Sequence, residues 1–168
     1  MHKGSSVAHY NEFLFMPRRL IFLVLALLTA DAHAPWVGIW RLNPAKSTVN
    51  NDSRFKRVTL KIDAEGDSLK VTYDMVGVRG GVNHIEWVGA FDGKDYAVQG
   101  LDYVMTNAYT KLSDRSYRID VKADGVPVAS TTVLVSEDGK TLESTTMEKN
   151  ARGETVSTKS VYERTQVP

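Results

Sequence analysis

Few residues of this sequence could do chemistry, and His84 comes closest to a recognisable pattern. His84 and Glu86 are two residues apart, so on a β-strand both side chains would leave the same face, as half of a metal site requires. No third ligand accompanies them, and the chain has no cysteine, which excludes thiolate ligands and thiol catalysis. A Ser-His-Asp triad would also have to recruit His84, but no nucleophile elbow is present. We therefore expect no metal and no cofactor, and interpret these side chains as a solvated polar face.

Carboxylates are the other route to catalysis. Asp74, Glu86 and Asp102 could form an acid-base pair of the kind that hydrolases use. Their positions are, however, typical of solvent-facing strand residues or turns. We therefore expect a protein that is not an enzyme and name no catalytic residue, with a small-molecule hydrolase or isomerase as the less favoured alternative.

A second set of residues suits binding. Tyr103, Met105, Asn107 and Tyr109 would share one face of a strand, and this face combines apolar bodies with polar tips. An interior face of this kind suits an apolar ligand with one or two polar groups. The competing interpretations, that these residues fill a core or point outward, stay open, and a core position is favoured for Trp87. The candidate ligand-binding residues are Tyr73, Met75, Trp87, Tyr103, Met105, Asn107, Tyr109, Tyr117 and Tyr162.

The elements that position these residues are predicted to be strands, because the chain after Asn43 alternates apolar and polar residues with period two. Segments 54–64 and 68–76 form a predicted hairpin around the turn Glu65-Gly66-Asp67. The other predicted strands are 36–42, 82–91, 95–98, 101–112, 116–123, 126–136, 140–150 and 154–164. About ten strands joined by short turns predict an all-β, up-and-down antiparallel meander, and closure into a barrel removes its exposed edges.

Residues 1–32 are expected to lie outside this domain, which we place at 35–168. Arg18 and Arg19 precede an apolar run, 20–30, and A-x-A sites follow it, as in a secretory signal peptide. We predict cleavage after Ala32, with Met16 as a candidate start codon. The apolar run is shorter than the roughly 20 residues of a permanent membrane span, so we expect a periplasmic or secreted protein with no stable span after signal removal.

Composition supports one globular domain. The 168 residues are 42% apolar and 24% charged, which is ordinary for a globular chain. Without residues 1–32, acidic and basic side chains are equal in number, so the charge balance provides no basic surface for nucleic acid. An exported chain without cysteine would depend on packing and sheet hydrogen bonds in place of disulfides.

A family resemblance rests on these features together. Gly38-x-Trp40 on the first strand, the meander, and Val161-Tyr162-Glu163-Arg164 at its end resemble the calycin superfamily of lipocalins and fatty-acid-binding proteins. The segments GIWRLNPAKS, FDGKDYAV and SEDGKTL are similar to bacterial exported lipocalin-like domains. The resemblance covers residues 36–164 and implies that Trp40 plugs the closed end of the barrel, where Arg164 covers it as a cation on an indole face.

The sequence also departs from that family. Residues 43–54 are too few for the two-helix lid of fatty-acid-binding proteins, so no helical lid is expected. Their carboxylate-binding Arg-x-Tyr pair corresponds to Ser160 and Tyr162, and Lys159 points to the opposite face, so the pair lacks its cation. The predicted function is binding of a small apolar or amphipathic molecule inside the barrel. The alternative is a packed barrel that acts as a protein-interaction or envelope-stress module.

Overall fold

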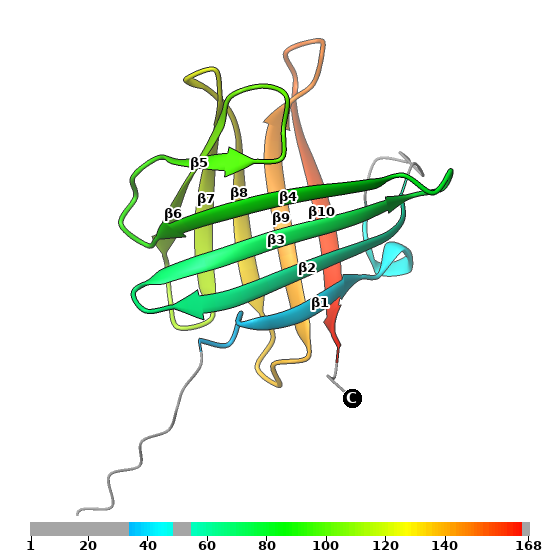
Figure 1. Cartoon of the computed structure of the whole chain (residues 1–168), viewed down its shortest axis with the longest axis vertical. Coiled ribbons are helices and arrows are strands. Elements are labelled where there is room, and N and C mark those ends of the chain that lie inside the picture. Colours follow the sequence, from blue (N-terminus) through cyan, green and yellow to red (C-terminus); the bar gives the residue numbers. More distant parts are fainter. Residues whose placement is uncertain (1–33, 49–54, 166–168) are drawn as a thin grey trace, which may run out of the picture. The chain divides into compact units, whose positions relative to one another are not determined.

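A computed structural model describes residues 34–48 and 55–165, and these form a closed barrel of ten antiparallel strands (Figure 1). The strands are β1 (Gly38–Leu42), β2 (Phe55–Glu65), β3 (Ser68–Gly77), β4 (Val82–Ala90), β5 (Tyr96–Gln99), β6 (Met105–Lys111), β7 (Ser116–Ala123), β8 (Val126–Val135), β9 (Thr141–Lys149) and β10 (Thr155–Arg164). Consecutive strands pair throughout, and β1 pairs with both β2 and β10 to close the barrel. The predicted all-β, up-and-down barrel of about ten strands is confirmed.

Helical structure within the described ranges is limited to one 3-10 turn, η1 (Pro44–Lys46). Asn43 caps it by accepting a hydrogen bond from the amide of Ala45 at 3.1 Å. In the same ranges, no helix has the length and apolar character to cross a membrane. The predicted signal peptide and cleavage site lie outside the described residues.

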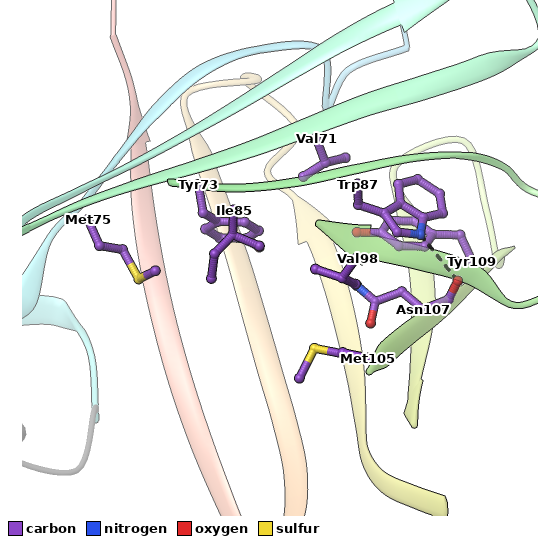
Figure 2. Close-up of a pocket in the computed structure, with 9 residues that line it drawn as sticks. All are labelled: Val71, Tyr73, Met75, Ile85, Trp87, Val98, Met105, Asn107 and Tyr109. Carbon is purple, nitrogen blue, oxygen red and sulfur yellow. Dashed lines mark hydrogen bonds between the residues drawn. The ribbon is translucent and has the colours of Figure 1, made fainter. Parts of the chain in front are cut away.

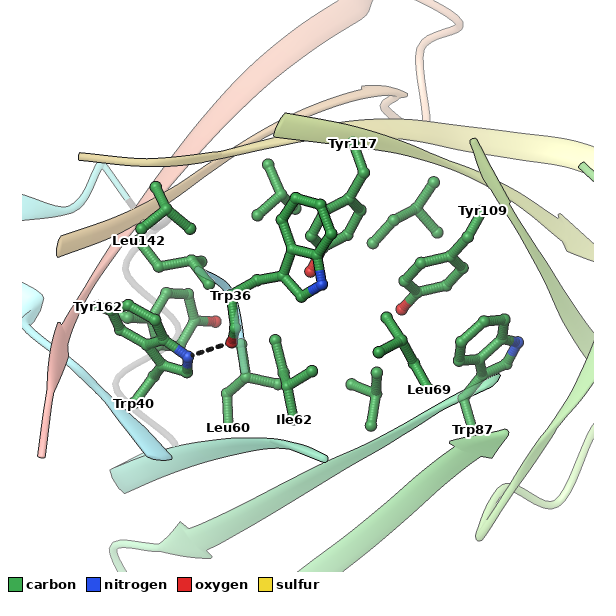
Figure 3. Packing of buried hydrophobic residues seen from close by; sticks show 14 residues of the cluster. Trp36, Trp40, Leu60, Ile62, Leu69, Trp87, Tyr109, Tyr117, Leu142 and Tyr162 are labelled. Atoms are coloured by element: carbon green, nitrogen blue, oxygen red, sulfur yellow. Dashed lines mark hydrogen bonds between the residues drawn. The ribbon is translucent and has the colours of Figure 1, made fainter. Parts of the chain in front are cut away.

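The barrel interior is set by one face of each strand. Trp40 of β1 pairs with Leu60 of β2, which pairs with Tyr73 of β3 and through it with Ile85 of β4. Because side chains alternate between faces, residues two positions from each of these also point inward. The buried core comprises Trp36, Trp40, Leu60, Ile62, Leu69, Val71, Trp87, Tyr109, Tyr117, Ile119, Val133, Val135, Leu142 and Tyr162 (Figure 3). These apolar and aromatic side chains supply the driving force for closure.

The prediction that residues 101–112 form one continuous strand is wrong at its start, because β6 begins only at Met105. Gly100 has φ +87°, a conformation that L-residues rarely adopt, and a Cβ there would collide with the carbonyl oxygen of His84. The chain therefore turns out of the sheet after β5. Tyr103 lies in the resulting loop and is 47% exposed.

Candidate functional site

Trp40 and Arg164 lie together at one end of the barrel. Trp40 is fully buried, and its indole nitrogen donates to the backbone carbonyl of Trp36 at 2.8 Å (Figure 3). The Arg164 guanidinium carbon lies 4.1 Å from the centroid of the Trp40 ring, within cation-π distance. The same guanidinium donates to three backbone carbonyls, those of Pro35, Val37 (2.7 Å) and Gly139 (2.6 Å). It thereby ties both chain ends of the domain to the β8–β9 turn.

Gly38 provides the space for this arrangement. Its φ is +143°, and a Cβ at this position would collide with Nη1 of Arg164. Glycine is therefore required two residues before Trp40 by both its backbone conformation and the guanidinium that passes over it. These two constraints explain why glycine occupies the first position of the G-x-W pattern in this chain.

An aromatic layer fills the interior next to this closed end. Trp36 precedes β1 and makes edge-to-face contacts with Phe91 and Tyr117, with ring centroids 5.3 Å apart in both cases. Trp87 stacks on Tyr109 with centroids 3.8 Å apart and an interplanar angle of 18°. Aromatic pairs of these geometries add stabilisation beyond their buried area. This layer makes the closed end a packed core.

Beside the layer, a cavity of about 250 Å³ lies between β3, β4, β5 and β6 (Figure 2). Its lining consists of Val71, Tyr73, Met75, Ile85, Trp87, Val98, Met105, Asn107 and Tyr109. These side chains project from four neighbouring strands, as strand alternation requires. The cavity is slightly smaller than the 300–1,000 Å³ typical of sites for drug-sized molecules, so it suits a small ligand.

The lining is uncharged. Burial raises the pKa of Tyr73 to about 12 and that of Tyr109 well above its usual range, so both phenols stay protonated at physiological pH. Asn107 is the only side chain of the nine that is neither aliphatic, thioether nor aromatic. Its Oδ1 is buried and has no hydrogen-bond partner among the described residues, while its backbone carbonyl accepts from Trp87 Nε1 at 3.3 Å. The cavity thus has an apolar wall with one unused acceptor.

A row of hydroxyl groups faces the interior from another part of the wall. On β9 and β10, Leu142 pairs with Tyr162 in the core, and the alternate positions beyond them carry short polar side chains. The row consists of Thr131, Ser144, Thr146, Thr158 and Ser160. Thr131 and Thr146 share a hydrogen bond of 2.8 Å between their hydroxyls. The interior therefore has an apolar side and a hydroxyl-bearing side.

Six of the nine predicted ligand-binding residues line the cavity: Tyr73, Met75, Trp87, Met105, Asn107 and Tyr109. Tyr103 does not, because it lies in the loop before β6. Tyr117 and Tyr162 are buried in the core and do not line the cavity, although Tyr117 stacks on the lining residue Tyr109 with ring centroids 5.4 Å apart. Burial raises the pKa of both hydroxyls. Sequence reasoning did not single out Ile85, Val98 or the hydroxyl row as site residues, although period-two alternation places Ile85 on the face of Trp87.

The residues considered for catalysis or metal binding lie outside the barrel. His84 Nδ1 is 2.7 Å from Asp74 Oδ1, and Glu86 is 2.7 Å from Lys70 Nζ. Alternation with inward-facing Ile85 places His84 and Glu86 on the outer face of β4. Across residues 34–48 and 55–165, no three acidic or histidine side chains are grouped to hold a metal ion.

The outer face of β7, β8 and β9 carries a groove of about 560 Å³. Val128 and Met147 line it with exposed fractions of 41% and 45%, and Lys122 and Glu148 add charges. It is separate from the interior cavity and has the mixed character of a surface contact region.

No protein-family model matches the chain, and no curated protein shows significant sequence similarity to it.

Proposed function

We propose that this protein is an exported, lipocalin-like barrel that binds a small apolar or amphipathic molecule in the cavity between β3 and β6. The observation that supports it is the lining: eight of the nine side chains are aliphatic, thioether or aromatic, and they surround about 250 Å³. Export is the expectation from the sequence of residues 1–32.

Binding is favoured over catalysis by the same lining. None of the nine residues carries a carboxylate, an imidazole or a hydroxymethyl nucleophile. Burial raises the pKa values of Tyr73 and Tyr109, so neither phenol supplies a phenolate base at neutral pH. Both act as apolar walls with hydrogen-bonding tips. A cavity of this composition holds a molecule more readily than it transforms one.

Native mass spectrometry of the chain recovered from the exported fraction of expressing cells, followed by denaturation and analysis of released compounds, tests the proposal. We expect a stoichiometric small molecule that is lost on Ile85→Phe, since the larger ring would occupy the cavity. Val88→Phe is the matched control, because Val88 is 39% exposed on the outer face of the same strand. Retention of the molecule by the Ile85→Phe variant would place its site outside the cavity.

The same preparation tests export. N-terminal sequencing is expected to begin at residue 33, after cleavage behind Ala32. An uncleaved chain in the cytoplasmic fraction would contradict export while leaving ligand binding to be decided by the mass spectrum.

A protein-interaction module is the second candidate function. It is favoured by the groove on the outer face, where Val128 and Met147 are exposed. A charge introduced at Met147, which is 45% exposed in that groove, would weaken such a contact without affecting the interior, so cross-linking with Met147→Glu separates the two functions.

A further inference from the structure

We infer, on the basis of the proposed function, that the ligand is an uncharged aromatic molecule of one or two rings that donates a hydrogen bond to Asn107. Three properties of the cavity carry this inference: its size, the chemistry of its walls and the unused acceptor within it.

Size limits the ligand to a small ring system. A dry cavity of about 150 Å³ lined by aliphatic and aromatic residues accommodates benzene. The cavity here measures about 250 Å³, which suits one ring with a substituent or two fused rings. A long acyl chain would have to leave the cavity and cross the interior towards the hydroxyl row.

The walls favour an aromatic body over an aliphatic one. Trp87 and Tyr109 form a stacked pair at one side, and Tyr117 continues this stack beyond Tyr109, so a flat ring in the cavity would meet an aromatic wall. Met75 and Met105 also line the cavity, and Figure 2 shows Met75 at the opposite end of the lining from Trp87. Thioether sulfurs make favourable contacts with ring edges, and their flexible side chains adapt to a ligand.

Charge is disfavoured within the cavity. No lining residue carries a formal charge at neutral pH, and an ionised carboxylate taken from water into such a site would have no cation to pair with. Lys159, the nearest basic residue in sequence to the interior position Ser160, forms an ion pair with Glu143 at 2.6 Å. The site therefore discriminates against fatty-acid and other carboxylate ligands.

Asn107 fixes the polar group of the ligand. A buried carbonyl oxygen without a donor is unfavourable by about 1–3 kcal/mol, and Asn107 Oδ1 is in this state. A hydroxyl or N–H group on the ligand would satisfy it. A methoxy group could not, because it is an acceptor only.

Five bicyclic compounds with the same ten-carbon ring skeleton test each element of the inference by calorimetry and equilibrium dialysis against the purified chain at pH 7. They are naphthalene, 2-naphthol, 2-methoxynaphthalene, 2-naphthoate and 2-decalol. We expect 2-naphthol to bind tightest, about 2- to 12-fold tighter than naphthalene, the ratio that one net hydrogen bond provides. Naphthoate is expected to bind at least about tenfold more weakly than naphthol.

Two variants test whether Asn107 causes the preference for 2-naphthol over naphthalene. Asn107→Leu should remove the naphthol advantage over naphthalene while leaving naphthalene binding intact. Gln99→Leu makes a similar change, amide to aliphatic, at an exposed position on β5. Gln99 follows the inward-facing Val98 and therefore points outward, so this variant should leave the ratio of naphthol to naphthalene affinity unchanged.

Each part of the inference can fail separately. Methoxynaphthalene binding as tightly as naphthol would overturn the donor requirement, decalol binding as tightly would overturn the aromatic preference, and tight naphthoate binding would overturn the exclusion of charge. In all three cases the proposed function would stand. No binding by any of the five compounds would overturn the whole inference, and the proposed function would then be decided by the native mass spectrum: a stoichiometric molecule that is lost on Ile85→Phe would uphold it, and the absence of any bound molecule would contradict it.

Discussion

Removal of the Arg164 side chain by Arg164→Ala should destabilise the barrel more than any other single loss of charge. The guanidinium makes three hydrogen bonds to carbonyls and lies over Trp40. A hydrogen bond to a charged group contributes about 1.5–3 kcal/mol. Because the three carbonyls are only partly buried and can regain water, we expect a total loss of about 3–5 kcal/mol in the free energy of unfolding. For a domain of this size, this lowers Tm by roughly 10–20 °C.

The matched control is Arg118→Ala. Arg118 is exposed on β7 and pairs with Asp120 at 3.0 Å. An exposed ion pair of this kind contributes about 0–1 kcal/mol. Urea denaturation followed by tryptophan fluorescence measures both variants on one scale. Equal losses in the two variants would refute a stabilising role for the Arg164 contacts.

A double-mutant cycle with Gly38→Ala tests why the glycine is needed. Alone, Gly38→Ala should be destabilising by more than the roughly 1–3 kcal/mol of backbone strain, because the new Cβ displaces the guanidinium. In the Arg164→Ala background there is no guanidinium for the new Cβ to displace, so only the backbone strain at residue 38 remains. We therefore expect the double variant to be about 1–3 kcal/mol more stable than the sum of the single losses. Additivity within about 0.5 kcal/mol would refute the spatial explanation of the G-x-W pattern.

Three further perturbations have defined outcomes. Trp36→Ala should lower the free energy of unfolding by about 3–5 kcal/mol in urea, as for other buried aromatics; a loss below about 1 kcal/mol would mean that Trp36 is not part of the core in solution. The pKa of Tyr73 is raised by burial to about 12, so its contribution to stability is complete below pH 10 and is lost as pH rises to 12. Tyr73→Phe should flatten the alkaline stability profile by up to about 2–3 kcal/mol, and an unchanged profile would contradict this. Hydrogen bonds from Lys94 lower the pKa of Asp92 to about 2, so its stabilisation is present above pH 4 and lost towards pH 2. Asp92→Asn should therefore reduce the acid sensitivity of the folded state, measured by circular dichroism, and an identical acid transition would exclude this contact as a contributor.

The fold could be predicted because its determinants are local. Alternation in segments such as 58–62 defines a buried face, and turn residues such as Gly66 and Gly139, both with positive φ, join consecutive strands. Short turns force sequential antiparallel pairing, and ten paired strands avoid free edges by closing. None of these steps requires information about distant parts of the chain.

The depth of a residue inside the barrel could not be predicted in the same way. Alternation shows that Tyr109 and Tyr117 face inward, but the position of each along the barrel depends on the register and tilt of all ten strands. Tyr109 borders the cavity, whereas Tyr117 lies against Trp36. The placement of Tyr103 failed for a different reason, because the alternating pattern continues through a loop that Gly100 creates. The hydroxyl row was missed since threonine and serine are also common on outer strand faces.

The division of the barrel into a packed end and a cavity has an energetic consequence. By the relation for dry cavities of about 24 cal/mol per Å³, 250 Å³ of unfilled space corresponds to a loss of at most about 6 kcal/mol, and entry of water reduces this. A chain without cysteine has to offset that loss through the aromatic layer and the Arg164 contacts at the closed end. Filling the space by Ile85→Phe should then raise the free energy of unfolding by about 1–2 kcal/mol while abolishing ligand binding, a trade of activity for stability. Destabilisation by this substitution would indicate that the cavity walls are too rigid to accept the ring, and would contradict this energetic account of the cavity.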